Sequence, residues 1–269
     1  MKKLMLMPSC RPDGLATFLR SLADTPALAD WELGIYAQAY TPDQKDAIRD
    51  SYGAERITRV IYRDDRLAPY MARAECYAAW SDVDVWASLD DDMECLPGMT
   101  NYQAPLKWLE ANPLTGVISC NWIKSEALFR RARYEQTFLP QALVNMSGGQ
   151  IYTRQMVDII LRNPILPYLF CDIQVALLAY LEGLTNYRFL GSLLIHRIMG
   201  KGGLKTMFQT QKMELPDPRW LPVKPSRPVY GPDNNYYMPD SSQLTVAARE
   251  RHERRLAERL QEIGNAQEA

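Results

Sequence analysis

The amino-acid sequence predicts an α/β fold in which a mostly parallel central sheet is flanked by helices. Short apolar runs of strand length alternate with helix-like segments through the first half of the chain, which is the pattern of βαβ units. With 269 residues, the chain is long enough to bury a sizeable core without disulfides or structural metals. The expected strands are 3–7, 31–37, 57–62, 83–89 and 116–122, and the expected helices are 15–23, 42–51, 67–80 and 100–111.

The second half of the chain predicts further elements of the same fold and an extension. Apolar residues spaced like one face of a helix predict a helix over 172–181, with a last strand over 187–194. A proline-rich stretch over 215–240 is expected to be extended. The charged segment 244–263 predicts a solvated helix that packs on the core or pairs with another chain.

Composition restricts the classes of function. The chain has 31 Lys and Arg against 32 Asp and Glu, which argues against wholesale electrostatic binding of nucleic acid. Its five cysteines are scattered and form no Cys-x-x-Cys pair, so neither a disulfide framework nor a zinc site is expected. A cytoplasmic location is the expectation. The apolar start ends at Pro8, and prolines and charges interrupt 159–184, so neither a signal peptide nor a membrane span is predicted.

The strongest chemical signal is the triplet Asp90-Asp91-Asp92, directly after the strand expected over 83–89. Open α/β sheets bind ligands beyond the carboxyl ends of their strands. Three adjacent carboxylates repel one another unless a cation neutralises them, and hard divalent ions prefer oxygen ligands. An isolated triplet is more often a solvated turn, but the apolar strand that leads into this one favours a metal site.

Three later residues carry weaker signals. Asp172 opens a helix, where a carboxylate is first of all an N-cap and secondly a candidate general base. His196 follows an apolar strand; a lone histidine is usually a surface or packed residue, but its neutral imidazole also ligates metals. Lys201 lies in a glycine-containing loop and has the reach to contact a phosphate.

In this order the acidic triplet, a Gly148-Gly149 turn, the carboxylate of Asp172 and the late His196 resemble the GT-A (Rossmann-like) glycosyltransferases, especially those of family 2 type. The resemblance covers about residues 1–205 and implies a transferase that moves a sugar from a nucleotide-sugar, by default a UDP-sugar, to an acceptor hydroxyl. It implies that Asp90, Asp92 and His196 hold Mn²⁺ or Mg²⁺. It also implies that Asp172 is the base of an inverting displacement.

The resemblance further assigns residues to the two substrates and divides the chain. It implies a catalytic domain over 1–205, with a donor half over 1–98 and an acceptor half over 99–205, followed by the proline-rich extension and charged helix over 206–269. The implied donor-binding residues are Pro8, Ser9, Arg11, Arg73, Asp90, Asp91 and Lys201, and the implied acceptor-binding residues are Trp122, Arg130, Gly148 and Gly149.

Two departures leave the donor open. The second expected strand ends in Ala37-Gln38-Ala39-Tyr40, without the acidic residue that many family members place against the nucleotide base. Cys171 stands where the family usually has a glutamate before the catalytic aspartate.

The acceptor is open as well. Arginines and aromatic residues over 122–134 suit a polysaccharide precursor, a protein or a hydroxymethylated base in phage DNA, although a solvated helix is the plainer interpretation. Two other functions compete with a glycosyltransferase. A non-catalytic nucleotide-sugar-binding module would need no base at Asp172. A sugar-phosphate nucleotidyltransferase would need a glycine-rich first loop, which the chain lacks.

Overall fold

A computed structural model describes residues 1–67, 69–123, 134–142, 149–163, 171–197, 228–230, 234–237 and 244–268, with the backbone alone for 69, 171–173, 228–230, 234–237 and 266–268. The strands are β1 (Lys3–Ser9), β2 (Glu32–Gln38), β3 (Ile57–Arg63), β4 (Val85–Leu89), β5 (Met93–Cys95), β6 (Thr115–Ile123), β7 (Phe138–Gln141), β8 (Gly149–Thr153), β9 (Thr185–His196), β10 (Pro228–Tyr230) and β11 (Asn234–Tyr237). The helices are α1 (Pro12–Ala23), α2 (Pro42–Arg49), α3 (Pro69–Ala79), α4 (Gln103–Ala111), α5 (Arg154–Arg162), α6 (Cys171–Leu181) and α8 (Val246–Glu268), with 3-10 turns at Pro26–Leu28 and Ala54–Arg56.

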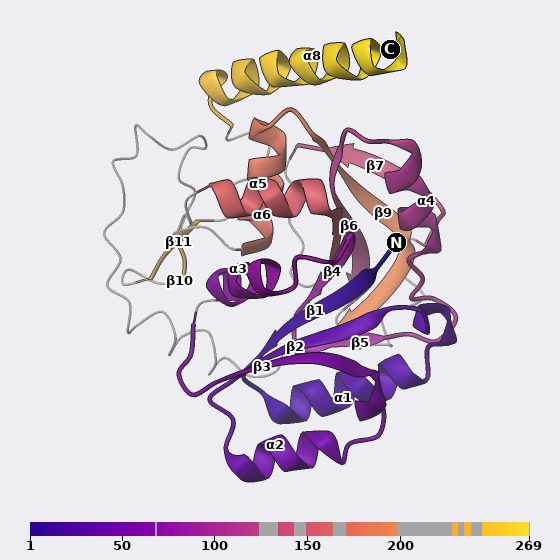
Figure 1. Cartoon of the computed structure of the whole chain (residues 1–269), viewed down its shortest axis with the longest axis vertical. Helices are drawn as coiled ribbons and strands as arrows, with labels where there is room; N and C mark the ends of the chain where they lie inside the picture. Colours follow the sequence, from indigo (N-terminus) through magenta and orange to yellow (C-terminus); the bar gives the residue numbers. More distant parts are fainter. Residues whose placement is uncertain are drawn as a thin grey trace.

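Nine strands form one sheet in the order β3-β2-β1-β4-β8-β6-β9-β5, with β7 paired to β9 (Figure 1). The pairs β3–β2, β2–β1, β1–β4 and β6–β9 are parallel, whereas β8 runs antiparallel to both β4 and β6. The predicted α/β fold with helices flanking a central sheet is therefore confirmed. Because β2 and β4 lie on opposite sides of β1, the sheet order reverses at β1, which is where such sheets bind ligands.

Each face of the sheet has its own hydrophobic core, because alternate residues of a strand point to opposite faces. On β1, Met5 and Met7 pack with residues of α1, α2 and α4, whereas Leu4 and Leu6 pack with α3, α5 and α6. A strand buried on both faces must be apolar at successive positions, which explains the unbroken apolar run of β1.

The strands expected in the first half are present within two residues of their expected ends. Helix α1 begins earlier than expected because Pro12 occupies its first turn, where its fixed φ favours the helix and its missing N–H costs nothing. The sequence analysis missed β5, β7, β8 and α5, as well as the short β10–β11 pair within the stretch expected to be extended. Strand β5 is only three residues long, so it is too short to show a period of its own.

The C-terminal helix packs back on the core, one of the two expected alternatives. Helix α8 lies across the C-terminal end of α6 (Figure 1), where cationic side chains reach backbone carbonyls that the helix leaves without an internal partner. Arg251 donates to the carbonyl of Leu181 at 3.1 Å, and Arg259 donates to that of Glu182 at 2.6 Å. Cations at a helix C-terminus are also favoured by the helix dipole. Among the described helices, none is long and apolar enough to cross a membrane.

Gly183, just after α6, makes the docking of α8 testable. Its φ of +75° favours glycine, and a Cβ there would lie 2.5 Å from backbone atoms of Arg255 and Leu256 in α8. Gly98 has a similar φ of +76° but open space around it. We expect Gly98→Ala to lose about 1–2 kcal/mol from the left-handed backbone alone, and Gly183→Ala to lose clearly more. Urea denaturation measures both, and equal losses would show that α8 does not pack closely there.

Gly14 provides a second test, because it brings α1 against the turn between β4 and β5. A Cβ on Gly14 would lie 2.1 Å from the carbonyl oxygen of Asp91. Replacing a helical glycine by alanine ordinarily stabilises a helix by up to about 1 kcal/mol, and Gly264→Ala in α8, where nothing lies within 4 Å, should show that gain. We expect Gly14→Ala to destabilise the protein by about 1–3 kcal/mol instead. A Gly14→Ala protein as stable as wild type would contradict this packing.

Candidate functional site

The three aspartates form a tight turn between β4 and β5. The backbone N–H of Met93 donates to the carbonyl of Asp90 at 3.2 Å, which is the hydrogen bond of a β-turn. Strand β4 pairs in parallel with β1, so the turn lies beyond the carboxyl ends of both strands. We name residues 90–92 the acidic turn. It occupies the position at which an α/β sheet binds ligands.

Asp91 points into the protein and is only 4% exposed. Its Oδ2 accepts hydrogen bonds from the hydroxyl of Ser9 at 2.9 Å and from the backbone N–H groups of Cys10 at 3.0 Å and Arg11 at 3.1 Å. Its Oδ1 accepts from Nε of Arg11 at 2.8 Å and also contacts Nη2 of the same side chain. The carboxylate therefore holds the loop that follows β1, and a direct contact between Asp91 and the donor stays a prediction.

Arg73 of α3 brings a second guanidinium to the acidic turn. Its Nη2 donates to Oδ1 of Asp90 at 2.6 Å and to the carbonyl of Leu89 at 3.3 Å. Arg73 is nearly buried, whereas the side chain of Asp90 remains 29% exposed. Both residues, predicted to contact the donor, therefore lie together at the end of β4.

Asp92 meets His196 because β5 and β9 pair antiparallel. Their register places Met93 opposite His196, and the backbone N–H of Arg197 donates to the carbonyl of Asp92 at 2.8 Å. Oδ1 of Asp92 then lies 3.2 Å from Nε2 of His196. Trp122 at the end of β6 packs edge-on against the imidazole, with ring centroids 5.1 Å apart. The structure thus brings together the predicted carboxylate and histidine from distant parts of the chain.

The two groups shift each other's protonation in opposite directions. Burial opposes the charged form of both, but the contact with Asp92 and its negative charge outweigh burial and raise the pKa of His196. Burial likewise opposes ionisation of Asp92, but His196 and the charge of Arg11 outweigh it and lower the pKa of that carboxyl. Without a metal, the pair is therefore favoured as a carboxylate beside an imidazolium.

The donor set fits a divalent cation in part. Oδ1 of Asp92 is buried and makes no hydrogen bond to the described residues, although it lies 3.2 Å from Nε2 of His196. Neighbouring ligands of an octahedral ion with bonds of about 2.1 Å stand roughly 3 Å apart, so both atoms can reach one ion. Among the described residues, no three His, Cys, Asp or Glu side chains are grouped to hold a metal, because Asp90 turns to Arg73. The arrangement therefore provides two protein ligands.

Other predicted site residues lie near the acidic turn or outside the described part of the chain. Gly149 of β8 pairs with Leu89, the residue before the turn, and Pro8 is buried next to Ser9 at the end of β1. Asp172 is the second residue of α6, but its side chain is not described. Three predicted residues, Arg130, Gly148 and Lys201, lie outside the described residues.

Tyr40 is a site residue that the sequence analysis did not assign. Its hydroxyl lies 2.6 Å from Oγ of Ser9, which in turn donates to Asp91. The preceding Ala39 has a φ of +56°, a left-handed conformation that is uncommon for a residue with a Cβ. Gln38 is also occupied, since its Oε1 accepts from the backbone N–H of Leu67 at 2.5 Å. The end of β2 is therefore fixed by neutral polar contacts, which no local sequence pattern predicts.

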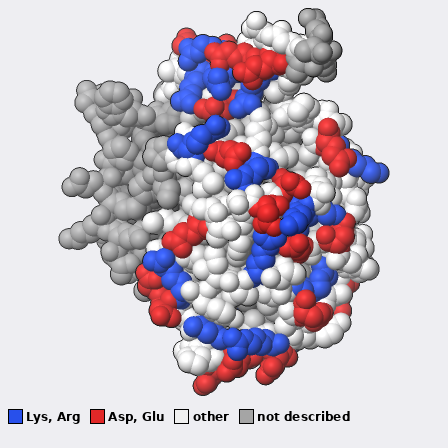
Figure 2. Space-filling model, in the orientation of Figure 1, with Lys and Arg blue, Asp and Glu red and all other residues white. Residues whose placement is uncertain are grey.

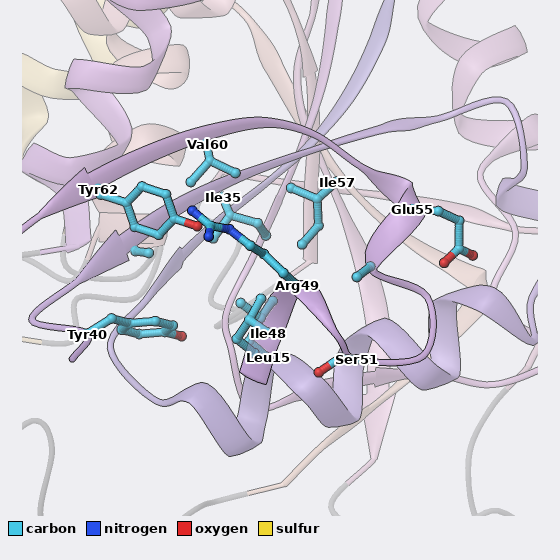
Figure 3. Close-up of a pocket in the computed structure, with 12 residues that line it drawn as sticks. Leu15, Ile35, Tyr40, Ile48, Arg49, Ser51, Glu55, Ile57, Val60 and Tyr62 are labelled. Atoms are coloured by element: carbon cyan, nitrogen blue, oxygen red, sulfur yellow. The ribbon is translucent and has the colours of Figure 1, made fainter. Parts of the chain in front are cut away.

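A cavity of about 590 Å³ lies between α2 and the face of β2 and β3 (Figure 3), and Tyr40, which contacts Ser9, is among the residues that line it. Its floor is apolar, with Ile35, Ile48 and Ile57, and Arg49 reaches across it in Figure 3. It exists because α2 is short and polar and buries only Ile48 against the sheet. None of the predicted site residues lines it, so we assign the chemistry to the acidic turn.

Charged groups on the described surface are mixed in sign. On the face shown in Figure 2, basic and acidic side chains lie next to one another. Ion pairs of this kind include Arg59 with Asp82 and Arg251 with Glu182. The view agrees with the near-zero net charge of the chain.

Searches with protein-family models and against curated proteins gave no match. Solved structures do match. S. aureus TarS 1-349 in complex with UDP-GlcNAc aligns with 77% of this chain at 14% identity and a TM-score of 0.57. GalNAc-T7 with UDP, GalNAc and Mn²⁺ aligns with 75% at 10% identity and a TM-score of 0.59. The mannosyltransferase PcManGT from Pyrobaculum calidifontis, in complex with GDP-Man and Mn²⁺, aligns with 75% at 15% identity and a TM-score of 0.57.

These identities are low, so the likeness concerns the fold. The chain covers 61% of the TarS structure, 44% of GalNAc-T7 and 58% of PcManGT, and thus spans less than two thirds of each. Each of the three structures holds a nucleotide or a nucleotide-sugar, and PcManGT is a mannosyltransferase. The sequence-based resemblance is confirmed at the level of architecture: this chain has the GT-A fold of nucleotide-sugar-dependent glycosyltransferases.

Proposed function

We propose that the chain is a metal-dependent glycosyltransferase that moves a sugar from a nucleotide-sugar to an acceptor hydroxyl. The observation that carries the proposal is the pairing of Asp92 with His196, 3.2 Å apart, at the carboxyl end of the sheet in a GT-A fold. The similar structures hold UDP, UDP-GlcNAc or GDP-Man, so a UDP-sugar is the first donor to test and a GDP-sugar the second.

Asp92 and His196 would hold the metal, with Asp90 as a further candidate ligand. Carboxylate ligands suit both Mg²⁺ and Mn²⁺, and two of the similar structures hold Mn²⁺, so Mn²⁺ is the first metal to test. The diphosphate of the donor would complete the coordination, as is usual where a protein supplies only one or two carboxylates. When bound, the metal would stabilise negative charge on the departing nucleoside diphosphate.

The loop after β1 and Arg73 would form the donor site. Arg73 is held by the carbonyl of Leu89 and by Asp90, so its guanidinium is oriented before any ligand arrives. Ser9 is fixed between Tyr40 and Asp91, which gives the loop a single conformation beside the acidic turn. We assign donor contacts to Pro8, Ser9, Arg11, Arg73, Asp90, Asp91 and Lys201.

The acceptor would enter beside Trp122 and Gly149, with Gly148 and Arg130 as further contacts. Trp122 packs against His196, so an acceptor on its ring would lie close to the proposed metal ligand. Asp172, in the first turn of α6, would take the proton from the attacking hydroxyl, which favours inversion by direct displacement. The acceptor class remains a choice between a polysaccharide precursor, a protein and a hydroxymethylated base in DNA.

Donor turnover tests the proposed function directly. We expect nucleoside diphosphate release from one member of a panel of UDP-, GDP-, dTDP- and CMP-sugars, only with Mn²⁺ or Mg²⁺, and a loss of 10²-fold or more in Asp92→Asn. Asp158→Asn is the matched control, because Asp158 pairs with Arg154 on the surface of α5. Nucleoside diphosphate release that is the same without metal and in Asp92→Asn would contradict the proposal. Products from a sugar 1-phosphate and a nucleoside triphosphate would favour a nucleotidyltransferase.

Asp172→Asn separates an enzyme from a binding module. A general base typically contributes about 10²–10⁴-fold to rate, so we expect turnover to fall by that factor while the donor Kd, measured by calorimetry, stays within a few fold. The reason is that the base acts on the acceptor, away from the donor's diphosphate. Donor binding in wild type without turnover of any acceptor would favour the binding module. Unchanged turnover in Asp172→Asn would remove Asp172 as the base.

A further inference from the structure

The guanidinium of Arg11 is locked between two carboxylates of the acidic turn. Nε and Nη2 contact Oδ1 of Asp91, and Nη1 lies 3.2 Å from Oδ2 of Asp92. Because the guanidinium is rigid and planar, fixing two of its nitrogens also fixes the direction of the third. Arg11 therefore cannot leave Asp92 without giving up its contacts with Asp91.

Asp91 is itself immobilised. Its second oxygen accepts from the hydroxyl of Ser9 and from the backbone N–H groups of Cys10 and Arg11. The hydroxyl of Ser9 is held in turn by Tyr40 at 2.6 Å. The chain of contacts from the end of β2 to Asp92 thus contains no exposed, freely rotating link among the described groups.

The contact with Arg11 distinguishes the two oxygens of Asp92. Oδ2 faces Arg11, whereas Oδ1 is buried, makes no hydrogen bond to the described residues and lies 3.2 Å from Nε2 of His196. Because the two oxygens of an ionised carboxylate are chemically equivalent, the contact with Arg11 fixes the plane of the carboxylate, with one oxygen facing Arg11 and the other facing the imidazole. Here one of them is kept for the side of the imidazole.

We propose that Arg11, anchored by Asp91, is a positioning residue that orients Asp92 so that Oδ1 alone is presented beside Nε2 of His196. The middle carboxylate of the acidic turn is then an anchor for Arg11 and not a metal ligand. The inference rests on the proposed metal site and adds to it the residues that set its geometry.

Charge and orientation predict opposite effects of removing Arg11. A cation 3.2 Å from Asp92 repels an incoming divalent ion, so charge alone predicts tighter metal binding once Arg11 is replaced. Loss of orientation predicts weaker binding, and residues that orient metal ligands typically contribute about 10–100-fold to affinity. We expect orientation to dominate, because the ion pair fixes the rotamer of a nearly buried ligand.

Titration with Mn²⁺, monitored by the electron paramagnetic resonance signal of the free ion, measures the metal Kd without turnover. We expect Arg11→Met, Arg11→Lys and Asp91→Asn each to weaken Mn²⁺ binding by about 10-fold or more. Arg11→Lys keeps the charge but not the planar fork. Arg59→Met is the control, because Arg59 of β3 also bridges two carboxylates, Glu32 at the start of β2 and Asp82 in the turn before β4. It should lower Tm and leave the Mn²⁺ Kd unchanged.

The outcomes separate this inference from the proposed function. Wild-type protein that binds no Mn²⁺, with or without nucleoside diphosphate, would overturn the metal site and the inference together. Wild-type binding with an unchanged or tighter Kd in Arg11→Met would overturn the positioning role alone. If Arg11→Lys binds Mn²⁺ with wild-type affinity, a positive charge at this position is sufficient and the planar guanidinium is not needed, which would also overturn the positioning role. If Arg11→Met does not fold, the Mn²⁺ Kd values of Arg11→Lys and Asp91→Asn test the positioning role, and wild-type values in both would overturn it.

Discussion

Three consecutive carboxylates at the end of a buried strand repel one another, and much of the surrounding structure supplies the cationic groups that neutralise them. Each aspartate has its own cationic partner: Arg73 for Asp90, Arg11 for Asp91, and His196 with Arg11 for Asp92. The partners come from α3, from the loop after β1 and from the end of β9. Truncating Arg73 or Arg11 would leave the charge of Asp90 or Asp91 without its cationic partner, which is far more costly than losing a surface pair. The acidic turn therefore links both halves of the sheet.

The sequence predicted what depends on local patterns. The apolar runs gave the strands of the first half, and the position of Asp90–Asp92 after such a run located the site at the end of β4. Local patterns alone could not place His196 beside Asp92, which only the family resemblance implied, since the contact depends on β5, a three-residue strand without a recognisable period, and on its antiparallel register with β9. The resemblance set Asp91 apart from the implied metal ligands Asp90 and Asp92, but it did not predict what Asp91 contacts. Only the fold shows that Asp91 faces inward to Arg11 and Ser9.

The end of β2 lacks the acidic residue that many family members place against the nucleotide base, and its contacts in the fold show how its polar side chains are used. Gln38 and Tyr40 have polar side chains, yet both are used within the protein, by Leu67 and by Ser9. A donor base near this strand would thus meet groups already bonded to Ser9 at the end of β1 and to Leu67 before α3. Specificity for the base would then depend on shape and on backbone groups more than on a charged side chain, which differs from a site with a carboxylate at this position.

The docking of α8 on α6 also has a consequence for the order of folding. The contacts of Arg251 and Arg259 with the end of α6 join residues 70 and 77 positions apart. Contacts so distant along the chain carry a large loop-closure entropy and tend to form after local ones. The sheet and α6 would then assemble first, in an intermediate in which the last turn of α6 is still hydrated. Closure by α8 would be a late step, visible as protection of the amides near Gly183 that lags behind protection of β1.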